Sequence, residues 1–239
     1  MLLTANEERN LHRALASLPS GIRILVLDAC STDGTAAIAL QFGARVVERE
    51  WRDFVDARKF ALSLVTTPWA FALDADEALD ERLRSALDSI DERHGGYIVR
   101  RSTKFAGKAM RLWSNEPLLR CFRVDSVDIE AHPSVGGSAQ LHERYLCLGS
   151  VGELAGTLEH FSYVDRRQYR EKFTRYTSLE AAGLTPSFAR LMRETIAVPW
   201  RLIKFGLLRG ALLDGPTGWY VLWWSALYPL VVAWRAWRA

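Results

Sequence analysis

Strand-like and helix-like segments alternate over residues 1–90, and this order constrains the fold more than any other feature of the sequence. Short apolar runs with the length and composition of buried strands occupy residues 22–30, 44–49 and 69–76. Around them, apolar residues recur at helical spacing in residues 7–18, 34–43, 54–64 and 78–90. Such alternation requires right-handed crossovers between parallel strands. The sequence therefore predicts an α/β fold, with a mostly parallel, Rossmann-like sheet flanked by helices.

The composition fits one globular domain with an extension, not a disordered chain or a polytopic membrane protein. The 239 residues are 49% hydrophobic and 25% charged, which are ordinary values for a globular protein. The net charge is only +3 and the basic residues are dispersed, so no nucleic acid partner is expected. Three cysteines without paired spacing argue against a zinc or disulfide framework and favour a reducing, cytosolic environment. The opening residues lack the regions of a signal peptide.

Polar side chains follow the predicted strands at the points where those strands end. Asp28 ends the apolar run of residues 22–30, and Asn6 and Glu7 follow the short apolar run at the start of the chain. Asp74 and Asp76 end the run of residues 69–76. The carboxyl ends of parallel strands meet at one edge of a sheet, where such folds bind their ligands. The sequence therefore predicts a nucleotide-binding cleft at this edge.

Asp74 and Asp76 are candidate metal ligands. On an extended segment, residues two apart project to the same side, so the two carboxylates can converge on one ion. Carboxylate oxygens suit Mg²⁺ or Mn²⁺, which often keep water ligands and take their remaining ligands from a substrate diphosphate. The alternative is that these acidic residues, with Glu77, begin the next helix and offset its macrodipole.

After residue 96 the pattern changes, and a distinct composition begins near the C-terminus. Residues 96–105 and 118–129 alternate as in β-ribbons, and residues 165–182 form a polar, charged helix. We expect a boundary between residues 170 and 186. This gives a main domain over residues 1–185 and a helical extension over residues 186–239.

The extension combines basic, apolar and tryptophan-rich stretches. Residues 200–213 mix arginine and lysine with large apolar residues, as in a basic amphipathic helix on an anionic surface. Residues 215–234 carry no charge and are long enough to cross a bilayer, but Pro216 and Pro229 interrupt them and tryptophan favours the headgroup layer. We predict an interfacial or re-entrant membrane anchor. The alternative is a helix pair packed on the main domain or on another subunit.

Four motifs resemble, in order, those of glycosyltransferase family 2 enzymes with a GT-A fold: "TANEERNL", "VLDACSTDGT", "DFVDARKFAL" and "FALDADE". The later motifs "RCFRV", "LHE" and "LEHFSY" resemble the branch that includes the lipopolysaccharide inner-core glucosyltransferases. The resemblance implies an inverting, metal-dependent transfer of a hexose from a UDP-sugar to a saccharide or lipid-linked acceptor. It also implies a role in bacterial envelope assembly, at the cytoplasmic face of the inner membrane.

The resemblance assigns expected roles to individual residues of this chain. Asp28 is expected to contact the uracil or ribose, Asp74 the ribose or the metal, and Asp76 the metal on the diphosphate. Lys59 departs from the family, which often has asparagine at that position. The remaining residues expected near the nucleotide are Thr4, Asn6 and Glu7, with Arg58 on the diphosphate.

Inverting transfer requires a carboxylate that deprotonates the acceptor hydroxyl. Glu143 in "AQLHERYL" is our candidate for this base, and His142 beside it can orient that glutamate or bind a phosphate. A histidine in an alternating segment is more often a structural hydrogen-bonding residue, and the same alternative applies to His160. Arg120 and Arg123 can bind phosphate, but their alternation with apolar residues favours a solvated strand face.

Two other functions fit some of these features. A sugar nucleotidyltransferase also uses paired aspartates and Mg²⁺, but it is expected to carry a Gly-rich basic loop where this chain reads "TANEERN". A non-catalytic partner that keeps the fold to bind a glycan or a membrane enzyme is the second alternative. The retained acidic residues Asp28, Asp74, Asp76 and Glu143 argue against it.

Overall fold

The computed structural model describes residues 1–131 and 143–238, which form two compact units. The first contains residues 1–102, 115–131 and 143–160, and the second contains residues 103–114 and 161–238. Helix α5 (Arg166–Ala182) belongs to the second unit, because its apolar side chains join the core formed with the C-terminal helices. The units therefore divide before the boundary expected at residue 185. The extent of the catalytic domain stays a prediction.

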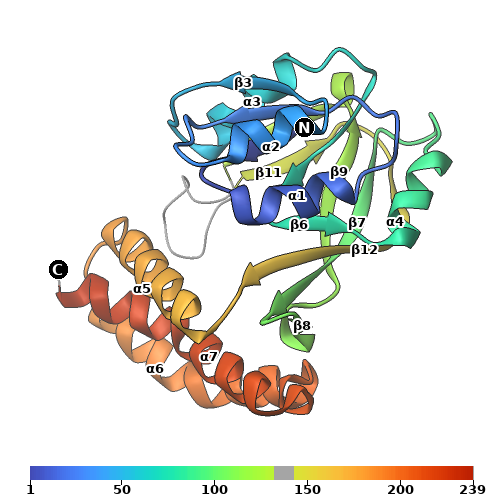
Figure 1. Ribbon diagram of the computed structural model, residues 1–239. Coiled ribbons are helices and arrows are strands. Elements are labelled where there is room, and N and C mark those ends of the chain that lie inside the picture. The colour runs from blue at the N-terminus through green and yellow to red at the C-terminus, as the bar shows by residue number, and fades with distance from the viewer. Residues whose placement is uncertain (132–142, 239) are drawn as a thin grey trace. The chain divides into compact units, whose positions relative to one another are not determined.

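A four-stranded parallel sheet lies at the centre of the first unit, as the alternating sequence predicted (Figure 1). All four strands are short, and the full burial of the second, Leu25–Asp28, explains its continuous apolar run. In spatial order, the described strands are β3 (Arg45–Glu48), β2 (Leu25–Asp28), β1 (Leu2–Thr4) and β5 (Leu73–Asp74).

A second sheet is mainly antiparallel, and most of its residues belong to the first unit. The pairs β4–β9, β9–β7 and β12–β6 are all antiparallel, and β8 (Lys108–Ala109) pairs with β7. A separate two-stranded ribbon joins β10 (Val127–Ala131) to β11 (Glu143–Cys147). In spatial order, the described strands of the second sheet are β4 (Trp69–Phe71), β9 (Glu116–Arg123), β7 (Gly96–Phe105), β12 (Val151–Tyr163) and β6 (Glu77–Leu79).

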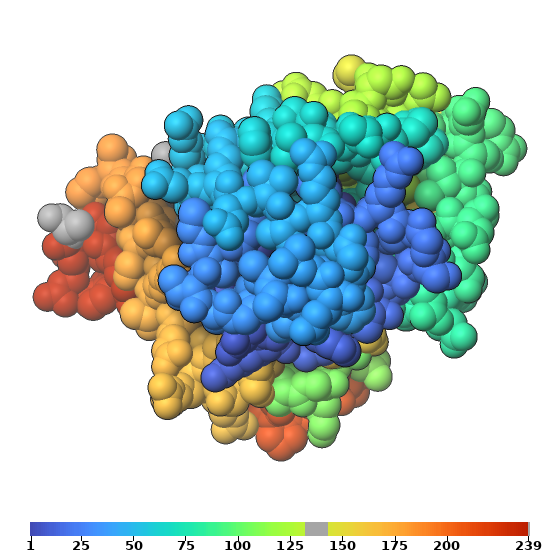
Figure 2. All heavy atoms as spheres, turned by 45° about the horizontal axis from the view of Figure 1, so that its top comes forward, coloured from blue at the N-terminus to red at the C-terminus, as the bar shows by residue number. Residues whose placement is uncertain are grey.

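Helices cover both faces of the parallel sheet, because alternate residues of each strand project to opposite sides. Val26 packs in one cluster with Leu11 of α1, whereas Leu27 packs in another with Ala57 of α3. Figure 2 shows the blue and cyan atoms of this N-terminal part as a continuous surface. The helices of the first unit are α1 (Glu8–Ala16), α2 (Thr35–Gln41), α3 (Phe54–Ser63) and α4 (Glu81–Ala86).

Local hydrogen bonds explain where these helices begin and end. Asp53 caps α3 by accepting the backbone N–H of Asp56 at 2.8 Å. Asp33 accepts the N–H of Thr35 at 3.0 Å at the start of α2. Gly43, at a φ of 71°, follows the end of that helix in the left-handed conformation that glycine adopts without strain. The expected limits of α1, α2 and α3 are therefore confirmed to within two residues.

The segment of residues 69–90 differs from its expectation. We expected one strand over residues 69–76 and a helix over residues 78–90, but three short strands precede α4. The first, β4, pairs with the antiparallel sheet; β5 pairs with the parallel sheet; and β6 returns to the antiparallel sheet beside β12. The helix begins only after Asp80, which accepts the N–H of Leu83 at 2.7 Å. Sheet pairing has thus replaced the first turn of the expected helix.

The second unit is mainly helical. Helices α6 (Phe188–Ile203) and α7 (Gly215–Arg238) lie side by side in Figure 1, and α5 packs against α7. A π-helical turn, η4 (Lys204–Leu208), and a 3-10 turn, η5 (Ala211–Asp214), connect α6 to α7. Gly218 allows close packing here, because a Cβ at this position would lie 2.0 Å from the carbonyl oxygen of Ala211.

Helix α7 continues through Pro229, so the expected interruption at this proline is wrong. Its neighbours Tyr228 and Val231 pack against the core of the second unit, which supports the helix on both sides of the proline. Within the described residues, no helix is both long and apolar enough to cross a membrane.

Candidate active site

The loops that follow β1 and β2 are tied together by a group of short hydrogen bonds. Thr4 donates its hydroxyl to Asp28 at 2.6 Å, and Ser31 donates its backbone N–H and hydroxyl to the same carboxylate, each at 2.7 Å. Asp28 is only 1% exposed. Because both of its oxygens accept hydrogen bonds, the carboxylate holds the two strand ends in register.

Asn6 extends this arrangement across the two loops. Its backbone adopts a φ of 55°, its N–H donates to the hydroxyl of Ser31 at 2.8 Å, and its side-chain oxygen accepts the N–H of Thr32 at 2.9 Å. Glu7 donates its N–H to the hydroxyl of Thr35 at 2.8 Å. The structure therefore brings Thr4, Asn6, Glu7 and Asp28 together at the carboxyl edge of the parallel sheet, where their positions were expected.

A network of buried ion pairs lies at the end of β5. Arg58 of α3 and Arg120 of β9 each contact one oxygen of Asp74, the latter at 2.7 Å. Arg120 also contacts Glu77 at 2.8 Å, and Glu77 accepts the backbone N–H of Asp74 at 3.1 Å. Two arginines that are 1% and 5% exposed thus hold two carboxylates in fixed orientations.

The pKa values of Asp74 and Glu77 are shifted in opposite directions. Burial acts to raise the pKa of Asp74, but the charges of Arg120 and Arg58 outweigh it and hold that pKa well below its ordinary value. Glu77 has a fully buried side chain, and burial raises its pKa although Arg120 and Arg101 oppose the change. Asp74 is therefore firmly ionised, and Glu77 is not the exposed first residue of a helix.

Arg120 was expected on a solvated strand face, and this expectation is wrong. Arg120 lies where the register between β9 and β7 shifts, and the two residues that follow it, Cys121 and Phe122, are both buried. Arg123 agrees with the expectation, because it pairs with exposed Asp125 at 2.7 Å. The two arginines of one strand thus have opposite environments.

Replacing Arg120 with methionine is expected to lower the free energy of unfolding by about 3–5 kcal/mol, because Asp74 and Glu77 lose a buried countercharge. Chemical denaturation monitored by circular dichroism measures this change. Arg123→Met is the matched control on the same strand, with an expected change below about 1 kcal/mol. Equal destabilisation by the two variants would show that the buried network does not carry this stability.

Asp76 and His160 come together, although the sequence left the role of His160 open. Asp76 lies in the turn between β5 and β6, and His160 lies on β12 at the register position of Glu77. The Nε2 atom of His160 is 3.2 Å from a carboxylate oxygen of Asp76. Because Asp76 is in a turn, the argument that it projects beside Asp74 from one strand is wrong. Within the described residues, no group of three or more acidic, histidine or cysteine side chains is arranged to hold a metal.

The pair formed by Asp76 and His160 fits an ion that takes its other ligands from elsewhere. A carboxylate and an imidazole are both metal ligands, and ions such as Mn²⁺ and Mg²⁺ need only one or two protein carboxylates when a diphosphate is present. Asp74 already has a guanidinium on each oxygen. Asp74 is therefore the weaker candidate for a metal ligand, and Asp76 stays the main candidate.

Glu143 begins β11 and contacts the network through Arg58. Its Oε1 atom accepts from Nε of Arg58 at 3.0 Å, and only 13% of the side chain is exposed. Nearby, Tyr145 has its pKa raised by burial. His142, the other candidate in this motif, lies outside the described residues.

Arg58 bridges Asp74 and Glu143, where we had expected it to reach toward a diphosphate. Its Nη1 atom, Nε of Arg120 and the hydroxyl of Tyr145 are buried without a hydrogen-bond partner among the described residues. Such groups are where a ligand or a water molecule is needed. Lys59 is half exposed and lies 3.5 Å from Asp128, so the departure from the family motif affects a surface pair and leaves this network intact.

A parallel sheet with polar residues at its carboxyl edge, and an antiparallel sheet whose His160 lies beside Asp76 in the turn after β5, are consistent with a GT-A glycosyltransferase. The chain belongs to glycosyl transferase family 2, whose model matches residues 2–145. The family resemblance of the four N-terminal motifs is thus confirmed, and the protein is a glycosyltransferase enzyme.

Relatives and one solved structure support this assignment over most of the chain. A lipopolysaccharide core biosynthesis glycosyltransferase, LpsC of Rhizobium meliloti, is 27% identical over 97% of this chain and 88% of its own. An uncharacterized glycosyltransferase of Rickettsia conorii is 36% identical over 91% of this chain and 81% of its own. The structure of the mannosyltransferase PcManGT of Pyrobaculum calidifontis, in complex with GDP-Man and Mn²⁺, matches with a TM-score of 0.53. It is 15% identical and covers 98% of this chain and 85% of that one, a likeness of fold alone.

Proposed function

We propose that this glycosyltransferase transfers a hexose, with inversion, from a UDP-sugar to a saccharide or lipid-linked acceptor of the bacterial envelope. The observation that carries the proposal is the gathering of Asp28, Asp74, Asp76 and Glu143 around the carboxyl edge of one parallel sheet. The relation to LpsC supports lipopolysaccharide core biosynthesis as the setting. The identity of the donor sugar and that of the acceptor hydroxyl are open to direct measurement.

The proposed donor site uses the two tied loops. Thr4, Asn6 and Glu7 lie beside the nucleotide, and Asp28 contacts the uracil or ribose through the loop that it organises. Asp74 is proposed at the ribose and not as the main metal ligand, because its oxygens are occupied by Arg58 and Arg120. Such a preorganised rim binds the nucleotide with little loss of side-chain freedom.

Asp76, together with His160, is proposed to hold Mg²⁺ or Mn²⁺. When bound, the ion neutralises charge on the departing diphosphate. The residues of the chain contribute by orientation: the hydrogen bond from His160 and the short turn between β5 and β6 fix the position of the Asp76 carboxylate. Glu77, one residue further, is paired in β6 and keeps this turn in place.

Glu143 is proposed as the general base. Arg58 donates to Oε1, which leaves Oε2 to accept the proton of the acceptor hydroxyl. As the hydroxyl oxygen forms its bond to the anomeric carbon, the bond from that carbon to the diphosphate oxygen breaks on the opposite side, and UDP leaves with the electron pair. His142 is proposed to orient Glu143 or to bind a phosphate.

Screening UDP-sugars for slow hydrolysis with Mn²⁺ or Mg²⁺ tests this function directly. We expect one hexose donor to release UDP faster than the others, and we expect chelation of the ion to stop the release. Isothermal titration with UDP alone separates binding from turnover. A folded protein with no affinity for any nucleotide sugar, with or without the ion, would contradict the proposed function.

The second unit is proposed to lie on the cytoplasmic face of the inner membrane. Large apolar side chains recur every three or four residues along α6 and are 38–77% exposed: Phe188, Met192, Ile196, Trp200 and Ile203. An exposed apolar stripe of this kind, followed by basic residues, is typical of a helix in the interfacial layer. The acceptor of an envelope enzyme would be met at the same surface.

The double variant Ile196→Gln with Trp200→Gln is expected to reduce binding to anionic vesicles by about tenfold or more, because it removes two side chains that bury apolar area in the bilayer. Sedimentation with phosphatidylglycerol vesicles measures the bound fraction. Leu40→Gln is the matched control, since Leu40 is 62% exposed on α2 of the first unit. If wild type and double variant sediment equally, the membrane assignment is wrong.

A further inference from the structure

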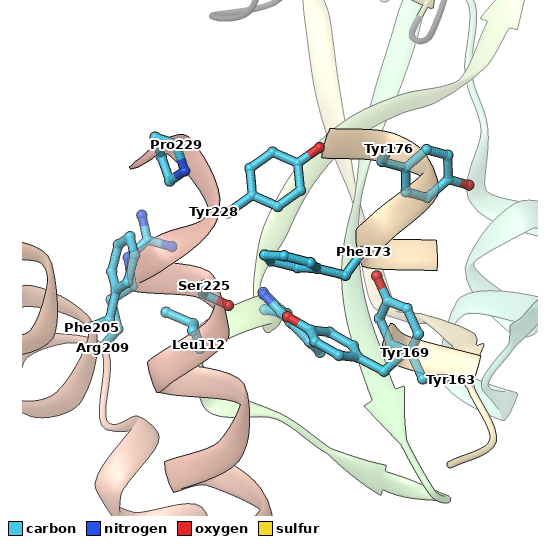
Figure 3. Close-up of a pocket in the computed structure, with 11 residues that line it drawn as sticks. Leu112, Tyr163, Tyr169, Phe173, Tyr176, Phe205, Arg209, Ser225, Tyr228 and Pro229 are labelled. Atoms are coloured by element: carbon cyan, nitrogen blue, oxygen red, sulfur yellow. The ribbon is translucent and has the colours of Figure 1, made fainter. Parts of the chain in front are cut away.

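A cavity of about 410 Å³ lies within the second unit (Figure 3). It is lined by residues of α5, η4 and α7, together with the turn that contains Leu112. Its volume lies within the range of roughly 300–1,000 Å³ that is typical of small-ligand pockets. No residue proposed for sugar transfer lines it.

One wall of this cavity is formed by aromatic rings that pack against one another. Tyr169 and Phe173 of α5 are 5% and 7% exposed, and Tyr228 of α7 meets Phe173 edge to face with ring centroids 5.4 Å apart. Trp113 stacks on Tyr169 at 6.0 Å. Figure 3 shows the rings of Phe173 and Tyr228 next to one another. Rings that are held by one another form a rigid wall, which favours an apolar occupant.

The hydroxyl groups at this wall are engaged by partners inside the protein. Tyr228 donates to a carboxylate oxygen of Glu180 at 2.6 Å, and Tyr169 is hydrogen-bonded to Ser225. A sugar ring needs many hydrogen-bond partners to replace its lost contacts with water. Because these hydroxyls are already satisfied, the wall is better suited to a hydrocarbon chain than to a saccharide.

Arg209 is the charged residue that lines the cavity. The residue is exposed, and no hydrogen bond or ion pair joins its guanidinium to another described residue. Two nearby arginines are paired: Arg201 with Glu194, and Arg111 with Asp214. An unpaired guanidinium beside an apolar cavity favours an occupant with one anionic group, such as a phosphate.

The π-helical turn η4 connects the cavity with an exposed apolar surface. Phe205 and Arg209 line the cavity, whereas Leu207 and Leu208 of the same turn are 67% and 73% exposed. Gly206 is buried, and a Cβ there would lie 3.3 Å from side-chain atoms of Leu212 and Leu222. The π-helical turn therefore exposes Leu207 and Leu208, whereas Phe205 and Arg209 line the cavity.

We propose that this cavity binds one acyl chain of an anionic membrane phospholipid, with Arg209 on the headgroup phosphate. The aromatic wall provides the apolar surface, and Leu207 and Leu208 provide continuity with the bilayer from which the chain would come. This site goes beyond the proposed transfer reaction, because it needs neither the donor nor the candidate base. A lipid held here would anchor the second unit by more than surface contact.

Displacement of the fluorescent fatty acid cis-parinaric acid from the full-length protein tests the site. We expect lysophosphatidylglycerol, kept below its micelle concentration, to displace the probe about tenfold more effectively than zwitterionic lysophosphatidylcholine. We expect glycerophosphoglycerol, which has the headgroup but no acyl chain, to leave the probe bound. Absence of displacement by either lysolipid, or displacement by a soluble oligosaccharide in their place, would overturn the proposal.

Two exposed cations, Lys204 at the start of η4 and Arg209 directly after it, provide a matched pair of variants. Arg209→Gln is expected to remove the preference for lysophosphatidylglycerol, whereas Lys204→Gln, at a residue that does not line the cavity, is expected to keep it. Ser225→Phe is expected to fill the cavity and abolish displacement by both lysolipids. Equal losses in Arg209→Gln and Lys204→Gln would show a general charge effect and reject the assignment of Arg209. Because no sugar donor is used, these outcomes are independent of the proposed transferase function.

Discussion

Replacing Asp76 with alanine is expected to lower metal-dependent turnover of the UDP-sugar by roughly a hundredfold to a thousandfold. The variant removes the carboxylate that is best placed to hold the ion, and charge neutralisation at a leaving diphosphate contributes several kcal/mol to such reactions. Release of UDP at saturating Mn²⁺ measures the effect. Because Asp76 lies in a turn and not in a strand of either sheet, the fold is expected to remain intact.

The control for this variant is Asp88→Ala, which removes an exposed aspartate in the 3-10 turn after α4 of the first unit. It is expected to keep wild-type turnover. Thermal denaturation of both variants checks the fold. If Asp76→Ala retains full activity that still depends on the ion, then the ion is held by other residues and the assignment of Asp76 fails.

Replacing Glu143 with glutamine is expected to leave UDP binding within about twofold of wild type and to lower sugar transfer by roughly a hundredfold to ten-thousandfold. Glutamine keeps the size of the side chain and an oxygen for Arg58, but it cannot accept the proton of the acceptor hydroxyl. Calorimetry with UDP and a transfer assay with the preferred donor separate the two effects.

Glu130→Gln provides the comparison for the base variant. Glu130 lies on β10, the strand that pairs with β11, and its ion pair with Arg144 is about half exposed on both sides. It is expected to transfer sugar normally, because an exposed pair contributes little to stability. Normal transfer by Glu143→Gln would mean that another group accepts the proton.

Much of the first unit could be predicted from the sequence, because its signals are local. The buried strand β2 and the edge strand β3 follow from short apolar runs, and α3 follows from helical spacing after the capping residue Asp53. The acidic residues at strand ends could be assigned to one rim, since parallel strands share an edge. The motifs that resemble glycosyltransferase family 2 predicted the family, and the family model confirms it.

The parts that could not be predicted depend on partners that are distant in the sequence. The run of residues 69–79 divides between two sheets because β4 finds β9, and β6 finds β12, across 40 or more residues of chain. From the sequence alone Arg120 is expected to be exposed, because its buried partners Asp74 and Glu77 are more than 40 residues away in the chain. His160 acquired a role only when the register of β12 brought it to Asp76.

The guanidinium shared by Asp74 and Glu143 has a consequence for how this protein can change during evolution. The planar guanidinium of Arg58 contacts Asp74 on the donor side and Glu143 on the acceptor side through different nitrogen atoms. A lysine side chain has a single nitrogen and therefore no equivalent geometry. Substitutions at Arg58, Asp74 and Glu143 should therefore be strongly epistatic, and a change at one position will be tolerated only in particular backgrounds at the other two. Redesign of the acceptor preference by replacing Glu143 with a residue that offers Arg58 no oxygen would thus disturb the donor half as well.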